Sequence, residues 1–292
     1  MSARIGVATA AEVPDLDDEG ELFLTALRDR GVAAEPAVWD AELDWSSYDA
    51  VVVRSTWDYA ERLPEFLAWA DRVGGVSRLL NSADVLRWNT DKRYLADLER
   101  AGIPIVPTQF LAPGDQPAHR FEHVEHVVKP VVSAGSRGTL RLGPAEVERS
   151  HTHAASLLDA GRGVMVQPYL HDVDEHGETA LLYLDGRFSH AMRKGPLLTT
   201  GMSLTEGLFL QEEMSPRDAS AAERELADAV LAAVPDRLGD DLLYARVDLL
   251  PSPDGPRLLE LELTEPSLFL DHHPPAVDLL ADAVLARAAR RG

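Results

Sequence analysis

Three acidic residues set among leucines and valines constrain this chain more than any other feature. Asp248 ends the segment Tyr-Ala-Arg-Val-Asp, and Glu260 and Glu262 alternate with leucines further on. Side chains alternate between the two faces of a strand, so the two glutamates share one face. A hairpin whose turn is centred near Asp254 brings Asp248 opposite Glu260. Like charges placed opposite each other destabilise a sheet, so this hairpin needs a cation.

Hard divalent ions such as Mg²⁺ take carboxylate oxygens as ligands, together with the phosphates of a substrate. The sequence therefore predicts a metal site formed by Asp248, Glu260 and Glu262. In the same register Arg246 falls opposite Glu262, and we expect it to neutralise that glutamate. The alternative is a solvated acidic face on an edge hairpin, which the surrounding leucines disfavour.

Lysine is scarce in this chain. Only three of the 28 basic residues are lysines, namely Lys92, Lys129 and Lys194, and the rest are arginines. Lysine is retained best where a compact, flexible ammonium is needed in place of a planar fork. The three lysines are therefore candidates for function, against the alternative of three leftover surface residues.

Composition excludes several classes of protein. The 292 residues contain no cysteine, which removes disulfides, thiolate metal sites and iron–sulfur clusters. A net charge of −21 argues against nucleic acid as a partner. No run approaches the ~18 consecutive apolar residues of a membrane helix, and residues 1–10 do not read as a signal peptide. We therefore expect a cytoplasmic protein with no membrane partner.

Alternating strand and helix patterns predict a small parallel α/β domain over roughly the first 80 residues. Its predicted elements are Arg4–Ala10, Asp17–Arg30, Ala33–Val38, Ala50–Arg54 and Leu63–Val73. Later predictions are helices at Thr90–Ala101 (capped by Asn89 or Thr90), Glu146–Ala160, Pro216–Val234 and Pro275–Arg291, a strand at Val164–Gln167, and a hairpin turning at Asp185-Gly186. Residues Gly195–Gly207 are expected to form a mobile loop.

A glycine-rich segment follows one of the lysines. It runs Ser133-Ala-Gly135-Ser136-Arg137-Gly138-Thr, four residues after Lys129. Glycines let backbone N–H groups crowd around phosphate oxygens, and hydroxyls and an arginine add donors. The spacing does not fit a P-loop, and Gly/Ser turns are common, so the segment alone is weak evidence. Its place after a scarce lysine strengthens the interpretation as a phosphate loop.

Other candidates are more often structural than functional when taken singly. Gln167, Tyr169 and Leu170 could form an adenine-binding hinge through backbone groups, and Glu178 could bind ribose hydroxyls. Arg54, Ser55 and Asp58 follow a strand at the carboxyl end, where open α/β sheets bind ligands. Arg54 suits a carboxylate and Asp58 an ammonium, so an amino-acid-like substrate is expected. His272 could contact substrate, whereas His123, His126, His151 and His153 are interpreted as solvated positions.

With these pieces in order, the chain resembles the ATP-grasp superfamily of carboxylate–amine ligases. The resemblance is carried by Lys92, Lys129, the loop 133–139, the hinge 167–170 with Glu178, the pair Arg193-Lys194, and the triad Asp248, Glu260 and Glu262. Residues 51–58, 87–92 and 260–267 look like the cyclo-ligases that close O-ureido-serine to cycloserine. The metal strand is also similar to bacterial glutathione synthetases. One departure is Glu262, because the superfamily usually has asparagine there, and this puts the number of metal ions in doubt.

The resemblance implies an α/β (α+β) ATP-grasp fold in which two lobes clamp ATP. The implied units are 1–88, an N-terminal α/β domain; 89–165, a lid lobe; and 166–292, the lobe with the metal site. The implied activity forms an acyl phosphate with ATP and joins it to an amine, using Mg²⁺ (two ions, with Mn²⁺ able to substitute).

Lys92 and Lys129 would then neutralise phosphates, and Arg193, Lys194 and Arg246 would form the catalytic set. A homo-oligomer is compatible with this resemblance. A small-molecule kinase and a non-catalytic nucleotide-binding module remain as alternatives.

Overall fold

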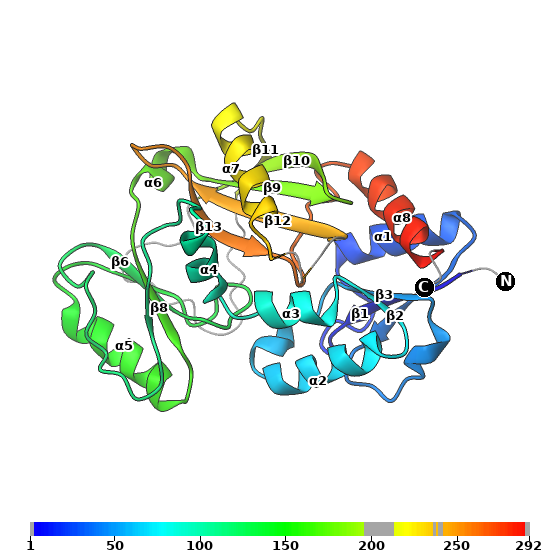
Figure 1. The fold of residues 1–292 in the computed structure, drawn as a ribbon, viewed down its shortest axis with the longest axis horizontal. Helices are drawn as coiled ribbons and strands as arrows, with labels where there is room; N and C mark the ends of the chain where they lie inside the picture. The colour runs from blue at the N-terminus through cyan, green and yellow to red at the C-terminus, as the bar shows by residue number, and fades with distance from the viewer. Residues whose placement is uncertain (1–2, 196–212, 236–237, 239–241, 290–292) are drawn as a thin grey trace.

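The computed structural model describes residues 3–195, 213–235, 238 and 242–289. The predicted loop Gly195–Gly207 lies outside these residues except for Gly195. The described elements form three sheets, and Figure 1 shows the five-stranded sheet between the N-terminal parallel sheet and the sheet that contains β6 and β8. No helix in the described ranges is both long enough and apolar enough to span a bilayer.

The N-terminal sheet is parallel, with strand order β2-β1-β3-β4. Its elements are β1 (Arg4–Thr9), α1 (Asp18–Asp29), β2 (Ala33–Val38), η1 (Trp45–Ser47), β3 (Ala50–Val53), η2 (Trp57–Ala60), α2 (Leu63–Gly74) and β4 (Arg78–Leu80). Asp17 caps α1 by accepting a hydrogen bond from the Gly20 N–H. The parallel α/β prediction for this region is confirmed.

A second sheet is antiparallel, with strand order β5-β8-β6-β7. Its strands are β5 (Gln109–Leu111), β6 (His126–Pro130), β7 (Leu140–Leu142) and β8 (Val164–Pro168), and α5 (Val147–Asp159) packs against it. The glycine-rich segment connects β6 to β7, so the end of β6 and this connection belong to the same small sheet-and-helix unit.

The third sheet has the strand order β11-β10-β9-β12-β13 and is antiparallel throughout. It consists of β9 (Glu178–Leu184), β10 (Arg187–Lys194), β11 (Met214–Pro216), β12 (Tyr244–Leu250) and β13 (Arg257–Glu262). The helices α3 (Ala83–Asn89), α4 (Tyr94–Arg100), α6 (Asp172–His176), α7 (Ala221–Ala232) and α8 (Pro275–Ala288) complete the described elements.

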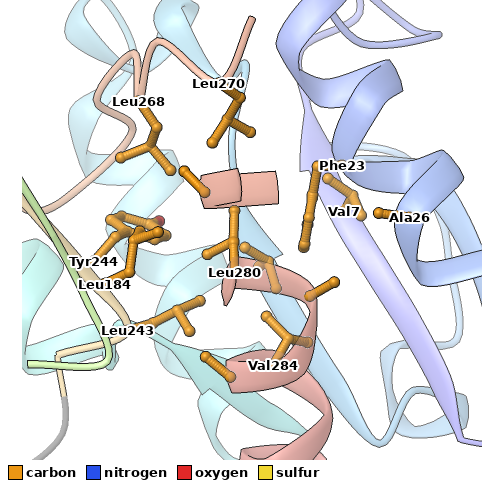
Figure 2. Packing of buried hydrophobic residues seen from close by; sticks show 14 of the residues in the cluster. Val7, Phe23, Ala26, Leu184, Leu243, Tyr244, Leu268, Leu270, Leu280 and Val284 are labelled. Atoms are coloured by element: carbon orange, nitrogen blue, oxygen red, sulfur yellow. The ribbon is translucent and has the colours of Figure 1, made fainter. Parts of the chain in front are cut away.

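One apolar cluster joins the third sheet to the N-terminal domain. Figure 2 shows Leu280 and Val284 of α8 between Phe23 of α1 on one side and Leu184 and Tyr244 on the other. All five side chains are buried. Because protein interiors are close-packed, this cluster holds the two sheets in a fixed relation.

Two predicted helices begin later than expected. The helix predicted over Thr90–Ala101 is α4, which begins only at Tyr94, and a separate helix, α3, is capped by Ser82 and ends at Asn89. The Asn89 side chain does not act as a cap; it bonds to the backbone of β13. The helix predicted from Pro216 begins at Ala221, where Ser220 forms a capping box.

The three predicted units remain a proposal. The boundary at residue 88 falls inside α3, and the boundary at residue 165 falls inside β8. Each unit nevertheless contains most of one sheet.

Candidate active site

The strand register gathers the predicted carboxylates on one face of the third sheet. Asp248 pairs with Glu260, and Arg246 pairs with Glu262, as the sequence predicts. Asp248 also pairs with Ala180 of β9, two residues from Glu178. Directly paired residues share a face, so all four acidic side chains and Arg246 project from the same side.

A β-bulge in the hairpin β9–β10 decides which basic residue joins this face. The register shifts between Phe188 and His190, so that Lys194 pairs with Glu178. Without the extra residue, Arg193 would take this place. Instead Arg193 pairs with Thr179 on the opposite face, and its Nε donates to the His176 carbonyl at 3.0 Å. The structure therefore places Arg193 and Lys194 on opposite faces of the sheet, and a catalytic role for Arg193 stays a prediction.

Asp248 is the most buried of the carboxylates. Arg246 Nε and Nη2 donate to its two oxygens, each at 2.9 Å, and Lys194 Nζ lies at 3.4 Å. Burial opposes ionisation of this group, but the charges of Arg246 and Lys194 outweigh it and hold the pKa of Asp248 below its usual value. Lys194 also forms an ion pair with Glu178.

Glu260 lies between two of the three lysines. Lys92 Nζ is 3.0 Å from Glu260 Oε1, and Lys129 Nζ is 3.9 Å from Oε2. Burial raises the pKa of Glu260, but the two ammonium groups lower it further, and the net shift is downward. Burial and the neighbouring Lys92 charge lower the pKa of Lys129, although Glu260 opposes this. Lys92 also donates to the Ser133 carbonyl at 3.0 Å, which ties it to the glycine-rich segment.

Glu262 is the metal-ligand candidate whose pKa is raised, although it has a basic partner. Arg246 Nη2 donates to it at 2.6 Å. Burial together with the charges of Glu260 and Asp248 nevertheless raises the pKa of Glu262 to about 7. Carboxylates that share a buried site raise one another's pKa in this way, and a bound cation would act in the opposite direction.

Glu265 belongs to the same surroundings, and the sequence reasoning did not select it as a site residue. Burial and the neighbouring Glu262 raise the pKa of Glu265 to about 8. Tyr59 of η2 forms a hydrogen bond with it, so the N-terminal domain reaches this edge of the site. An acidic residue three positions after Glu262, in the same largely apolar run, was the available signal.

The oxygen donors fit a hard divalent cation in chemistry, though they do not enclose one. In the described part of the chain, no three His, Cys, Asp or Glu side chains are arranged to hold a metal ion. The acidic groups turn toward lysines and Arg246 instead. Mg²⁺ takes one or two carboxylates together with substrate phosphates, and this donor set can supply them.

The glycine-rich segment includes left-handed backbone, which glycine adopts most readily. Gly135, Ser136 and Gly138 have φ values of 60°, 59° and 74°. The Arg137 N–H donates to the Ala134 carbonyl and the Thr139 N–H to the Ser136 carbonyl, so anion binding by this segment stays a prediction. Arg137 extends to within 3.6 Å of Glu61 in the N-terminal domain. His153 of α5 forms a hydrogen bond of 2.8 Å with the Gly138 carbonyl, which fixes the end of the segment.

The predicted hinge residues have other contacts. Gln167 is buried in β8, and its side chain donates to Thr108 at 2.9 Å. The Tyr169 N–H donates to the Glu125 carbonyl at 2.8 Å, so it is not free to contact a base. The Leu170 carbonyl accepts from Val173. An adenine-binding role for this hinge stays a prediction.

The expected substrate residues of the N-terminal domain are engaged in structural contacts. Arg54 is buried, donating to the Pro266 carbonyl at 2.9 Å and to Glu19 at 3.0 Å. Ser55 donates to Asp17, and Asp58 accepts from the Trp39 indole, both at 2.9 Å. These contacts favour structural roles over the predicted substrate contacts.

The histidines divide into two groups. His272 is exposed and lies 3.9 Å from Asp271, and within the described ranges it forms no hydrogen bond or ion pair with Asp248, Glu260 or Glu262. His123 is exposed as predicted. His126 is fully buried, contrary to the prediction, and shares the Ser150 hydroxyl with His119 at 2.8 and 2.9 Å. A buried polar side chain of this kind needs hydrogen-bond partners, which these contacts supply.

Comparison with known proteins adds independent information. The family model of the D-cycloserine synthetase DcsG N-terminal domain matches residues 5–81. The cycloserine biosynthesis protein DcsG of Streptomyces lavendulae is 40% identical over 293 residues, covering 96% of this chain and 97% of that protein. The crystal structure of D-cycloserine synthetase DcsG matches with a TM-score of 0.88 and 38% identity, over 98% of this chain and all of that one.

A more distant structure shares the fold. The ATP-grasp ligase PsnB, in complex with a minimal precursor, Mg and ADP, matches with a TM-score of 0.63. It is 20% identical, and the match covers 98% of each chain. At this identity the likeness shows the ATP-grasp fold and nothing finer.

Proposed function

This chain belongs to the D-cycloserine synthetase family of ATP-grasp ligases, and from this premise we propose that it closes an O-ureido-serine-like amino acid into a ring. It is an ATP-dependent, ADP-forming ligase that activates a carboxylate as an acyl phosphate. The proposed nucleophile is a nitrogen of the same molecule. Because the chain belongs to a ligase family, we favour a ligase over the two alternatives, a small-molecule kinase and a non-catalytic nucleotide-binding module.

One observation supports the proposed nucleotide and metal roles: most charged groups of the site are paired with opposite charges, while Glu262 keeps a raised pKa despite its partner. Lys92 pairs with Glu260, Lys194 with Glu178 and Asp248, and Arg246 with Glu262. Burying isolated charges is costly, so this pairing keeps an unliganded site stable. Mg²⁺ together with ATP brings a cation for the carboxylates and anions for the lysines.

Asp248, Glu260 and Glu262 are the residues that would hold Mg²⁺. When bound, the ion supplies Lewis-acid stabilisation of phosphoryl oxygens. Glu262 makes the site more acidic than one with asparagine, and Arg246 compensates with its 2.6 Å contact. We propose that this compensation lets Glu262 serve as an oxygen ligand. The number of ions is left to metal titration.

Lys92, Lys129 and the glycine-rich segment 133–139 are proposed to bind the phosphates. Both lysines approach Glu260, and Lys92 also contacts Ser133 of the segment. A compact ammonium can follow a phosphate oxygen as a lobe closes, because its four-carbon stem is flexible. Lys194, on the same face, is proposed to stabilise the negative charge that develops at the reacting carboxyl group.

The test is ATP-dependent phosphate release with a panel of small amino acids, followed by mass spectrometry of the product. The panel contains O-ureido-D-serine, O-ureido-L-serine, D-alanine and L-alanine, with Mg²⁺ present. We expect release of ADP and phosphate only with an O-ureido-serine, accompanied by a cyclic product. Turnover with D-alanine to a dipeptide, or a stable phosphorylated product, would contradict the proposed ring closure.

A further inference from the structure

The strand that carries two of the proposed metal ligands lies at the edge of its sheet. β13 pairs with β12 on one side only. The backbone groups on its other side need partners, because a buried unpaired N–H or C=O is costly. Near its start the backbone of a neighbouring segment supplies them. The Val106 N–H donates to the Leu258 carbonyl, and the Leu258 N–H donates to the Pro104 carbonyl, both at 2.9 Å.

Beyond Glu260, three side chains replace that neighbouring backbone. The Leu261 N–H donates to the Tyr94 hydroxyl at 2.8 Å, and Asn89 Nδ2 donates to the Leu261 carbonyl at 2.7 Å. The Leu263 N–H donates to Asn89 Oδ1 at 2.7 Å, and Asn81 Nδ2 donates to the Leu263 carbonyl at 2.8 Å. The outward N–H and C=O groups of Leu261 and Leu263 are thus all paired.

Asn89 ends α3 and Tyr94 begins α4, the two helices near β13 in Figure 1, and Asn81 directly follows β4. Asn81, Asn89 and Tyr94 are buried, with exposed fractions of 1%, 7% and 3%. Their hydrogen bonds are therefore shielded from water. Hydrogen bonds are stronger in such low-dielectric surroundings than in water.

The placement of these bonds matters for the acidic face. The Asn89 amide bonds to the backbone of the residues immediately before and after Glu262, and it also accepts from the Thr264 hydroxyl at 3.3 Å. The Tyr94 bond is made to the residue between Glu260 and Glu262. A shift of this short backbone segment would therefore move both glutamates.

Asn81 also bonds to the backbone at the start of β12. Its Nδ2 also donates to the Tyr244 carbonyl at 3.0 Å, and its Oδ1 accepts from the Leu243 N–H at 2.7 Å. One amide thus fastens the start of β12 to the end of β13. The spacing between Asp248 and the glutamates depends on how far these two strands separate.

We propose that Asn81, Asn89 and Tyr94 are positioning residues, which set the geometry of the metal ligands by completing the edge of β13. The proposal rests on the proposed function, because it takes Glu260 and Glu262 to be ligands of a metal ion that binds together with phosphates. None of the three needs to touch metal or substrate. They act through the backbone of residues 261–263.

The experiment uses Tyr94→Phe, which removes one hydroxyl, and Asn89→Ala, which removes the amide contacts to Leu261, Leu263 and Thr264. Groups that orient metal ligands typically change metal affinity or activity by about 10–100-fold. We expect the half-saturating Mg²⁺ concentration to rise by about tenfold in Asn89→Ala and less in Tyr94→Phe. The KM of the amino-acid substrate should stay within about twofold, and excess Mg²⁺ should restore part of kcat.

Ser77→Ala is the matched control. Ser77 precedes β4, at the end of the strand opposite Asn81, and donates to the Tyr48 carbonyl at 2.9 Å. Its loss also removes a side chain–backbone hydrogen bond, but we expect no change in Mg²⁺ dependence. If Asn89→Ala only lowers the active fraction, with the Mg²⁺ dependence of the wild type, the proposal is overturned.

Hydrogen exchange gives a readout that does not depend on turnover. The amides of Leu261 and Leu263 should exchange at least about tenfold faster in Asn89→Ala and Tyr94→Phe than in the wild type or Ser77→Ala. Unchanged exchange in both variants would overturn the proposal even if activity falls. A wild-type protein with no Mg²⁺-dependent turnover would contradict the proposed function instead, and the exchange rates would still decide whether the three side chains hold β13.

Discussion

The carboxyl end of β3 and the end of β13 both present charged residues to the region between the sheets, and they behave differently. At β13, Glu262 pairs with Arg246 of the same sheet, Glu260 pairs with Lys92 and Lys129 of other elements, and the pKa of Glu262 remains raised. At β3, Arg54 donates to Glu19 and to the Pro266 carbonyl. Unrelieved charge, more than the presence of charge, therefore separates a candidate ligand site from a structural tie.

The largest expected effect is at the end of β13. Glu260→Gln should lower ATP turnover by about a thousandfold or more, because the amide cannot neutralise a cation. Phosphate release per folded molecule is the measurement, with folding checked by circular dichroism. Turnover within tenfold of the wild type would remove Glu260 from the metal site.

The opposite outcome is expected at β3. Arg54→Met should destabilise the protein by roughly 3 kcal/mol, because it leaves Glu19 without its buried partner. The KM of the amino-acid substrate should change by less than about threefold, as a structural tie does not bind substrate. Urea unfolding and steady-state kinetics test this. A large rise in KM with little loss of stability would restore the substrate role that the sequence predicts.

Two adjacent residues of β10 sharpen the contrast. Lys194→Met should lower kcat by about 100-fold, because an electrostatic contact to the reacting group is lost. Arg193→Met should change kcat by less than about threefold, since its side chain lies on the opposite face. An equal loss of kcat in the two variants would contradict the assignment of Lys194 to the catalytic face and of Arg193 to the opposite face.

The smallest effect concerns pH. An acid whose folded pKa is raised stays protonated longer in the native state, so the native state binds more protons between pH 4.5 and 7. Stability of the Mg²⁺-free protein should therefore fall as pH rises through this window, by about 1–2 kcal/mol. Urea unfolding of the wild type and of Glu262→Gln tests this. The variant should show a flatter profile, and a wild-type curve that rises across the window would be inconsistent with a strained Glu262.

The hairpin β12–β13 was predictable because its information is local. Strand alternation and the position of the turn give the pairing of Asp248 with Glu260 without knowledge of any other element. The hairpin β9–β10 was not, since one extra residue at a bulge exchanges the faces of Arg193 and Lys194. Pattern alone does not locate such a bulge.

Contacts between distant segments were the least predictable. Asn89 reads as a helix cap because asparagine is common there, but its partners are 172 and 174 positions away in the chain. Arg54 reads as a ligand-binding residue from its place after a strand, and its partner carbonyl is 212 positions away. Propensity describes neighbours in sequence, and both residues are defined by tertiary contacts.

The central claim is that Asp248, Glu260 and Glu262 form a metal site whose charge is offset by Arg246 and the three lysines until a nucleotide binds. The most direct test is Mn²⁺ titration in the presence of ADP, followed by electron paramagnetic resonance, with Mg²⁺ as competitor. We expect the wild type to bind Mn²⁺ in an ADP-dependent and Mg²⁺-competitive manner, and Glu260→Gln to bind it at least about tenfold more weakly. Equal Mn²⁺ affinity in the two proteins would contradict the claim.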